Sequence, residues 1–165
     1  MRRFIPFALL LALFVCVGGL SAKDDEPRYK TAELKHLTVA DGVTLPDQIN
    51  TLDYLNLVYD KLREELGKCK IADQVVDDGA TVPDADAANS IVVELRITDF
   101  QKAGFTMMHP GALSWEATVY RRSDHSVITT IPRTFKMPPA GYRNDKVLSN
   151  LTAEEAAHDI RKALK

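Results

Sequence analysis

Two methionines and a histidine are adjacent in residues 105–110, which read FTMMHP. The thioethers of Met107 and Met108 beside the imidazole of His109 form a soft ligand set that could hold Cu(I). Metal-carrying methionine tracts usually contain more ligands, and methionines in loops often fill gaps over a hydrophobic core. We therefore expect no metal here and favour contact with a protein or lipid partner through Phe105, Met107, Met108 and His109.

The other reactive residue types do not fall into a catalytic or metal-binding spacing. No two of the four histidines are at metal-ligand spacing, and no Cys-x-x-Cys or His-Glu-x-x-His motif occurs. The serine motif Gly-x-Ser-x-Gly is absent, and so are the glycine-rich motifs that hold nucleotide phosphates. Because no nucleophile, base and orienting group can be grouped, the sequence predicts a protein that is not an enzyme and uses no cofactor.

An acidic stretch, residues 77–89, offers hard oxygen ligands of the kind that bind calcium. The candidate ligands are Asp77, Asp78, Asp84, Asp86 and Asn89. Their spacing differs from that of an EF-hand loop, and no terminal Glu follows. We expect a solvated surface loop at this position.

Two segments alternate between apolar and polar residues, which is typical of half-buried strands. The apolar rows are Ile91, Val93, Leu95 and Ile97, then Leu113, Trp115, Ala117 and Val119. The opposite face would carry Glu94, Arg96, Thr98, Glu116, Thr118 and Tyr120. For that face we favour solvent exposure with cross-strand ion pairs, and the alternatives are that it clasps a polar ligand or docks a second subunit.

Two helices are expected to cover the apolar rows. The first is predicted to start at Asn50 or Thr51 and stop at Gly67, with one apolar stripe formed by Leu52, Leu55, Tyr59, Leu62 and Leu66. The last is predicted to open at Thr152, which has capping-box spacing to Glu155, and to bury Ala156, Ile160 and Leu164. The sequence does not decide whether residues 145–151 form an earlier turn of that helix.

Further strands are predicted at residues 29–39, 71–76 and 127–135, which gives the order strand, helix, four strands, helix. Pro132 would remove one ladder amide and therefore predicts an edge position for the last strand. The predicted fold class is α+β, an α/β sandwich in which one mixed sheet of four to five strands has both helices packed on one face. If its strands are parallel, the first strand–helix–strand unit is a right-handed crossover.

The first residues have the layout of a secretory signal peptide. Arg2 and Arg3 precede a run without charge, and the small residues up to Ala22 suit cleavage there. We therefore divide the chain into a signal peptide, residues 1–22, and a single globular α+β domain, residues 23–165. A retained anchor is the alternative, and contact with a membrane is expected only if the amino terminus is retained or is lipidated at Cys16.

Charge and cysteine content limit the remaining classes. Without Arg2 and Arg3 the chain has 19 basic and 23 acidic residues, a net charge of −4, so no nucleic-acid surface is expected. Cys69 is then the only thiol, and no internal disulfide can form. We expect a buried, inert Cys69 rather than a reactive thiol or one paired between chains.

The segments 91–100 (IVVELRITDF) and 115–120 (WEATVY), with the turn that leads to Val127 and Ile128, resemble a group of uncharacterised bacterial envelope lipoproteins with a domain of unknown function. That group is similar in shape to the amino-terminal domain of TolB and to the curli-secretion lipoprotein. Its members commonly carry a lipidation signal, which this chain lacks, and a Thr-Gly pair in the turn, where this chain has DHS at 124–126.

The resemblance implies an exported protein, periplasmic or associated with the outer membrane, and it supplies no catalytic residues. We expect a non-enzymatic binding or assembly module that presents a sheet edge and the loop 105–110. Its partner would be an envelope protein or a second copy of the chain. The alternative is a periplasmic protein that binds a small ligand or a metal.

Overall fold

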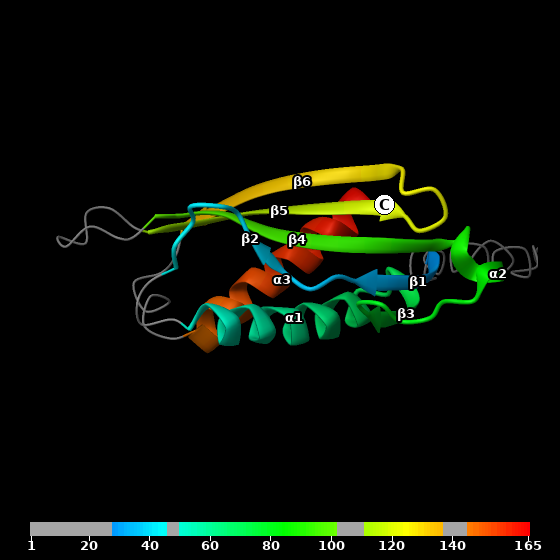
Figure 1. The fold of residues 1–165 in the computed structure, drawn as a ribbon, viewed down its shortest axis with the longest axis horizontal. Helices are drawn as coiled ribbons and strands as arrows, with labels where there is room; N and C mark the ends of the chain where they lie inside the picture. Colours follow the sequence, from blue (N-terminus) through cyan, green and yellow to red (C-terminus); the bar gives the residue numbers. More distant parts are fainter. Residues whose placement is uncertain (1–27, 46–49, 102–110, 137–144) are drawn as a thin grey trace, which may run out of the picture.

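The computed structural model describes residues 28–45, 50–101, 111–136 and 145–165. These residues form a mixed six-stranded sheet and three helices, and two of the helices lie against one face of the sheet (Figure 1). In chain order the elements are β1 (Tyr29–Leu34), β2 (Thr38–Val39), α1 (Thr51–Lys68), β3 (Ala72–Asp77), α2 (Asp84–Ala87), β4 (Ser90–Gln101), β5 (Ala112–Arg121), β6 (Val127–Lys136) and α3 (Asp145–Ala163).

The α+β class and the mixed sheet are as predicted, whereas the counts of strands and helices are higher. The predicted first strand is wrong as a single element, because the chain leaves the sheet at residues 35–37 and returns as the short strand β2. The predicted loop 77–89 contains the four-residue helix α2. Among the described residues, no helix is both long enough and apolar enough to cross a bilayer.

The strand order is β3-β1-β4-β5-β6, with β2 paired to β4 beyond the end of β1. Strand β1 runs parallel to both β3 and β4, so α1 connects parallel strands. Strands β4, β5 and β6 pair antiparallel. The edges are β3 and β6, which confirms the edge position that Pro132 predicted for the last strand.

The core lies between the sheet and helices α1 and α3. Both apolar rows that the alternation predicted are buried there: Ile91, Val93, Leu95 and Ile97 of β4, and Leu113, Trp115, Ala117 and Val119 of β5. A strand with one buried and one exposed row needs a covering layer, and the helices supply it. The register aligns the two rows, with Leu95 opposite Ala117 and Ile97 opposite Trp115.

Helix α1 is capped by Asn50, whose Oδ1 accepts hydrogen bonds from the amides of Leu52 and Asp53 at 3.0 and 3.3 Å. The predicted apolar stripe is wrong at its start, since Leu52 is 66% exposed. The side chains that α1 buries are Tyr54, Val58, Tyr59, Leu62 and Leu66. Most of them follow a spacing of four from Tyr54, a residue that the predicted stripe omits.

Helix α3 begins at Asp145, so residues 145–151 are its first turns and the predicted capping box at Thr152 is wrong. Thr152 lies inside the helix and is fully buried, with its Oγ1 donating to the carbonyl of Leu148 at 2.8 Å. The predicted apolar residues of this helix are buried, together with others on the same side: Leu148, Ala153, Ala156, Ala157, Ile160 and Leu164.

Candidate functional site

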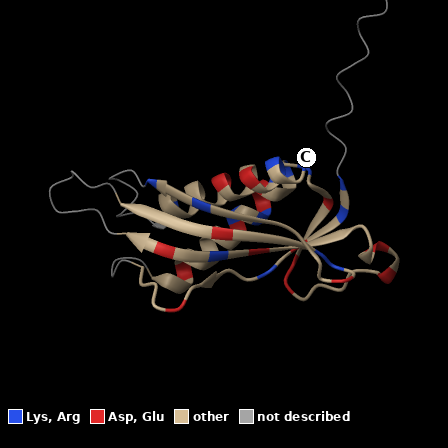
Figure 2. Ribbon diagram, turned by 90° about the horizontal axis from the view of Figure 1, so that it is seen from above, with Lys and Arg blue, Asp and Glu red and all other residues tan. Residues whose placement is uncertain are grey.

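Acidic and basic residues both occur along the strands of the sheet (Figure 2). The alternation of β4 and β5 puts Glu94, Arg96 and Glu116 on the face that turns away from α1 and α3. This face is not solvated throughout. Val92 of β4 is 2% exposed, and Val82 from the connection between β3 and β4 is also buried. That connection lies over the outer face beside β1, and the polar groups beneath it form the most buried charged cluster among the described residues.

Glu33 is the centre of this cluster. The alternation of β1 places it on the outer face, opposite Val92, while its neighbours Ala32 and Leu34 enter the core. Its side chain is only 3% exposed, and it forms ion pairs with Lys35 Nζ at 2.8 Å and with the guanidinium of Arg122. A buried carboxylate needs such partners, because burial removes its hydration.

The connection between β3 and β4 also contacts this cluster through its backbone, at Gly79 and Ala80. The amide of Gly79 donates to Glu33 Oε1 at 3.0 Å, and Arg122 Nη2 donates to the carbonyl of Ala80 at 3.3 Å. Gly79 has φ +76°, a conformation that glycine adopts without strain and that a side chain disfavours. Arg122 comes from the turn between β5 and β6, so the cluster fastens that turn to β1 and to the segment after β3.

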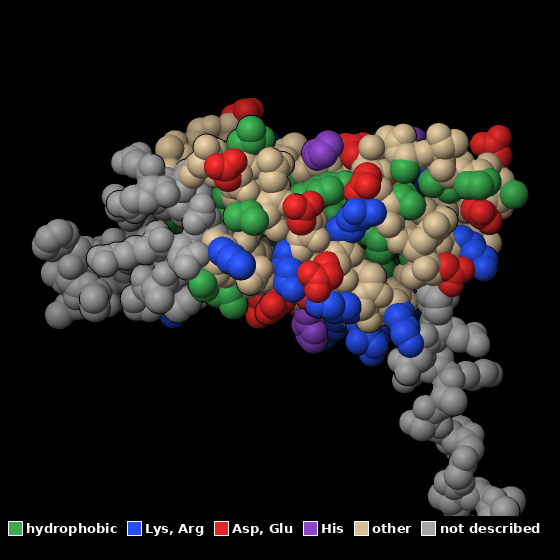
Figure 3. All heavy atoms as spheres, turned by 90° about the horizontal axis from the view of Figure 1, so that it is seen from below, with side chains coloured by type: hydrophobic (Ala, Val, Ile, Leu, Met, Phe, Trp, Pro, Cys, Tyr) green, Lys and Arg blue, Asp and Glu red, His purple; other side chains and the backbone are tan. Residues whose placement is uncertain are grey.

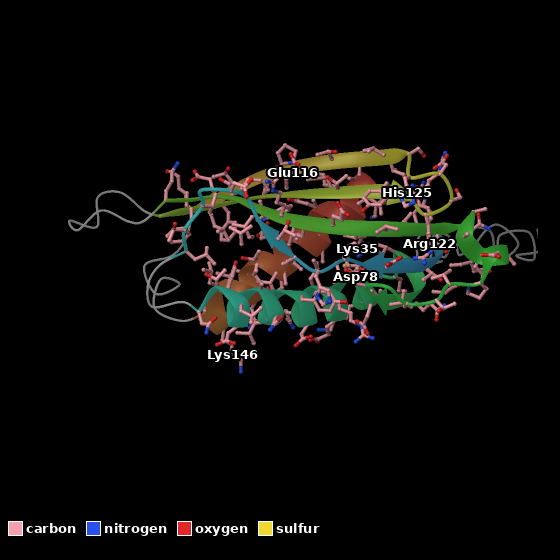
Figure 4. All side chains as sticks on the ribbon, in the orientation of Figure 1. Lys35, Asp78, Glu116, Arg122, His125 and Lys146 are labelled. Atoms are coloured by element: carbon pink, nitrogen blue, oxygen red, sulfur yellow. The ribbon has the colours of Figure 1, made fainter. Side chains whose placement is uncertain are left out.

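Lys35 joins Glu33 to a second carboxylate. Its Nζ lies 2.8 Å from Asp78 Oδ1, and Figure 4 shows the two side chains together at the end of β1. The hydrogen bond from Lys35 holds the pKa of Asp78 below its ordinary value, and the same bond raises the pKa of Lys35. The amide of His36 also donates to Asp78, at 3.2 Å. Both groups therefore stay charged near neutral pH.

Tyr59 of α1 reaches this cluster from the helical side. Its hydroxyl lies 3.2 Å from the carbonyl oxygen of Leu34 and 3.0 Å from Asp77 Oδ1, and it accepts a hydrogen bond from the amide of Asp78 at 3.3 Å. The ring of His36 stacks on Tyr59 with centroids 5.0 Å apart. Burial raises the pKa of the Tyr59 hydroxyl, so it acts as a neutral hydrogen-bonding group.

A groove of about 240 Å³ adjoins the cluster on the outer face of β4 and β5. Its lining residues are Lys35, His36, Thr38, Glu94, Leu95, Arg96, Glu116 and Thr118. Arg96 and Glu116 are cross-strand neighbours in the register, yet no ion pair within 4.0 Å joins Arg96 to any described carboxylate. The expected solvent exposure of this face holds for Glu94, Arg96 and Thr98, but the expected cross-strand ion pair is not formed between Arg96 and Glu116, so both groups are available to another molecule.

Tyr120 and Glu94 are joined where this groove approaches the turn between β5 and β6. The hydroxyl of Tyr120 donates to Glu94 Oε1. Burial is the main cause that raises the pKa of Tyr120, and the hydrogen bond to Glu94 raises it further. The ring of His125 lies 6.0 Å from that of Tyr120, centroid to centroid. His125 and Arg122 occupy the turn at one end of β5, whereas Glu116 lies along the strand (Figure 4).

These contacts define what the site can do. The carboxylates of Glu33 and Asp78 are each held by a cation and by a backbone amide, so their oxygens are already engaged in contacts within the fold. Arg96 and Glu116, with the hydroxyls of Thr38 and Thr118, can instead hold a polar group by charge and hydrogen bonds. In the described part of the chain, no group of three or more His, Cys, Asp or Glu side chains is placed to hold a metal ion.

The site residues predicted from sequence have different outcomes. Phe105, Met107, Met108 and His109 lie outside the described residues, so their predicted partner contact stays a prediction. Two adjacent acids of the predicted loop 77–89 have different partners. Asp77 contacts Arg63 and Tyr59 of α1, and Asp78 contacts Lys35. Neither is a freely solvated carboxylate.

Sequence reasoning missed the cluster around Glu33. The alternation of Thr31, Glu33 and Lys35 with Ala32 and Leu34 could have placed Glu33 on the outer face. Its burial could not be foreseen, because the cover comes from a segment 46 residues further along the chain. Arg122, 89 residues away from Glu33, gave no local signal at all.

No protein-family model matches the sequence, and no curated protein is similar to it in sequence. The fold is similar to that of several solved bacterial proteins. Protein XCC0632 from Xanthomonas campestris, of the domain family DUF330, superposes with a TM-score of 0.56 at 7% identity, over 84% of this chain and 88% of that protein. The hypothetical protein CT253 from Chlamydia trachomatis gives a TM-score of 0.57 at 9% identity, over 82% and 98%.

A weaker similarity, with a TM-score of 0.47 at 8% identity, is found with lipoprotein GNA1162 from Neisseria meningitidis, over 81% of this chain and 99% of that one. At such identities the comparisons establish the fold and not the activity. The expected likeness to the TolB domain and to the curli-secretion lipoprotein stays a prediction. The chain has the fold of bacterial proteins that include a DUF330 member and a hypothetical chlamydial protein.

Proposed function

We propose that this protein is an exported, non-enzymatic module of a bacterial envelope that binds a protein partner through the outer face of its sheet. The observation that carries the proposal is the groove on β4 and β5, in which Arg96 and Glu116 lie without an ion-pair partner among the described residues. Helices α1 and α3 cover the opposite face, so a partner has access to the outer face and to the two edges of the sheet.

The arrangement of charge supports binding more than catalysis. The ion pairs of Glu33, Lys35, Asp78 and Arg122 rigidify the border of the groove, and rigid borders lower the entropy cost of association. Paired charges in an interface favour one orientation of the partner and speed encounter. Export is supported by the signal-like composition of residues 1–22.

A second candidate function is the binding of a small zwitterionic ligand such as a free amino acid. The volume of about 240 Å³ suits a ligand of this size better than a larger molecule. Arg96 would bind the carboxylate of the ligand and Glu116 its ammonium group. Thr38 and Thr118 would supply hydroxyls on either side.

Site-specific photo-cross-linking in the producing bacterium tests the first candidate. A benzophenone side chain at Thr118, inside the groove, should give a defined adduct with one protein, and the adduct should disappear when Arg96→Glu is added. The same probe at Glu154, exposed on α3, is the matched control. Adducts from residue 154 but none from residue 118 would overturn the proposed binding surface. Export has a separate test, because mass spectrometry that finds residues 1–22 retained would contradict cleavage after Ala22.

Thermal melting with the twenty free amino acids tests the second candidate. A rise in melting temperature with one of them that is lost in both Arg96→Ala and Glu116→Ala, and kept in the control Lys136→Ala, supports the ligand site. No shift with any amino acid, together with a Thr118 adduct, supports the partner surface alone.

A further inference from the structure

We propose that the free edge of β3 pairs antiparallel with β3 of a second copy of this chain, across a two-fold axis at Gln74, and so joins two sheets into one. This surface lies at the β3 edge beside α1, away from the groove on β4 and β5. The failure of either proposal therefore leaves the other standing.

The backbone of β3 offers an open ladder to such a partner. Tyr29 N donates to the carbonyl of Ile71 at 3.3 Å, which fixes the side of β3 that faces β1. By the alternation of a strand, the amides and carbonyls of Ala72, Gln74 and Val76 then point toward the free edge. Among the described residues β3 pairs only with β1, and Asp73 and Gln74 are exposed.

The other edge of the sheet is protected against this kind of pairing. Strand β6 contains Pro132 near its middle, which cannot donate a ladder hydrogen bond. Its next residue, Arg133, is held toward α3 by Glu155 at 3.6 Å and by Asp159 at 3.3 Å. Strand β3, with the sequence ADQVVD, contains no proline and no lysine. Of the two edges, β3 is the one that can accept another strand.

A hollow beside β3 gives the second copy further surface. It has a volume of about 360 Å³ and lies between the strand and one side of α1, where its helical lining is Asp60, Arg63, Glu64 and Gly67. Apart from its chain neighbours and the backbone of its own helix, no described heavy atom lies within 4 Å of the point where a Cβ on Gly67 would stand. A strand pair of six residues alone is too small for a stable interface, which needs about 1,000 Å² or more, so α1 must contribute.

The charges along this side of α1 are complementary to themselves. A two-fold axis at Gln74 sets the two α1 helices antiparallel. Because Arg63 and Glu64 lie near the middle of the helical lining of the hollow, Arg63 of each copy would come next to Glu64 of the other. Basic and acidic side chains lie next to one another in the middle of the α1 side of the molecule, between areas of apolar and uncharged surface (Figure 3). The present partners of Arg63 and Glu64 are exposed pairs, which hold little energy and can be exchanged for pairs between copies. An unrelated peptide would need the matching mixture of signs, whereas a second copy supplies it.

Disulfide trapping tests both the partner and the register. In a Cys69→Ser background, Gln74→Cys should form a disulfide-linked dimer under mild oxidation, because a symmetric hydrogen-bonded pair places its Cα atoms about 5.5 Å apart. Val76→Cys alone should not cross-link, whereas a mixture of Val76→Cys with Ala72→Cys should. Cross-linking of Thr130→Cys on β6 without cross-linking of Gln74→Cys would overturn the proposal.

Light scattering of the exported chain provides the equilibrium test. The wild type is expected to be a dimer, and Gln74→Pro should raise its dissociation constant at least about tenfold by removing one outward amide per copy. Gln74→Thr, which keeps the amide, is the matched control. Arg63→Glu should weaken the dimer and Arg63→Glu with Glu64→Arg should restore it, so the result does not depend on the folding of the proline variant. A wild type that stays monomeric at the highest soluble concentration would refute the pairing.

Discussion

The hydroxyl of Tyr54 on α1 lies 2.9 Å from Thr152 Oγ1 on α3, and both side chains are completely buried. Thr152 donates its proton to the carbonyl of Leu148, so Tyr54 is the donor in the pair. This short chain of hydrogen bonds is a buried polar link between the two helices. Burial raises the pKa of Tyr54 well above its usual range, which keeps the donor protonated.

The direction of that hydrogen bond predicts unequal effects for two conservative substitutions. Tyr54→Phe removes the donor and leaves Thr152 bonded to Leu148, so we expect a loss of about 1 kcal/mol in the free energy of unfolding. Thr152→Val leaves the Tyr54 hydroxyl buried without a partner, and the loss should reach about 2–3 kcal/mol. Urea unfolding of both variants and of the double variant measures these values. A larger loss for Tyr54→Phe would show that the assigned direction is wrong.

The cluster around Glu33 is expected to stabilise the fold. Glu33→Gln leaves Lys35 and Arg122 without their shared carboxylate, and we expect a loss of about 2 kcal/mol, limited because both cations are partly exposed. Lys30→Ala, which removes an exposed pair with Asp73, should change stability by less than about 0.5 kcal/mol. Chemical denaturation compares the two. Equal effects would mean that the buried cluster contributes no more than a surface pair.

The thiol of Cys69 is expected to react slowly. The residue caps α1 and is partly buried, and desolvation raises its pKa despite the opposing effect of Arg161. Less thiolate is then present at pH 7 than for a free cysteine, and the thiolate is the reactive form. A chromogenic disulfide reagent should label the folded protein more slowly than the protein in denaturant, by about tenfold or more. Equally fast labelling of both would identify an activated thiol.

Much of the sheet could be predicted because its signals are local. In β4 and β5 the period of two is unbroken, and the residues that must be buried are adjacent to residues that must be solvated. Pro132 identified an edge for an equally local reason, the missing amide. The break between β1 and β2 could not be predicted from the sequence, because the side chain of Lys35 and the amide of His36 bind Asp78, and the ring of His36 stacks on Tyr59, all from segments distant along the chain.

The helix errors have a common cause. Thr152 and Glu155 have the spacing of a cap, yet packing against Tyr54 draws Thr152 into the interior of a longer helix. Leu52 fits the apolar period of α1 but falls outside the surface that the sheet and α3 cover. The spacing of apolar residues within a helix shows which of its faces can be buried. Which residues on that face are actually buried depends on the strands and helices that pack against it. The alternation did place Arg96 and Glu116 on one face that could clasp a polar ligand, but it could not show that the two side chains are left without an ion-pair partner.

Asp78 and Lys35 are expected to make stability depend on pH at both extremes. The folded protein lowers the pKa of Asp78 from 3.8, so its stabilisation is full above that value and is lost as the pH falls through the lower folded value. It raises the pKa of Lys35 from 10.5, so that contribution is full below 10.5 and is lost as the pH rises through the folded value. Asp78→Asn should therefore cost up to about 1 kcal/mol near neutrality. The difference from wild type should shrink below pH 3.8 and above pH 10.5.

Urea midpoints of the wild type and of Asp78→Asn across the pH range measure this difference, in which the effects of all other titrating groups cancel. Asp41→Asn, at an exposed position, serves as the matched control and should stay parallel to the wild type. A constant gap between Asp78→Asn and the wild type at every pH would mean that the aspartate acts through its shape and hydrogen bonds alone. A difference in urea midpoint that disappears at low pH would show that the charge on Asp78, in its ion pair with Lys35, stabilises the segment that covers Glu33.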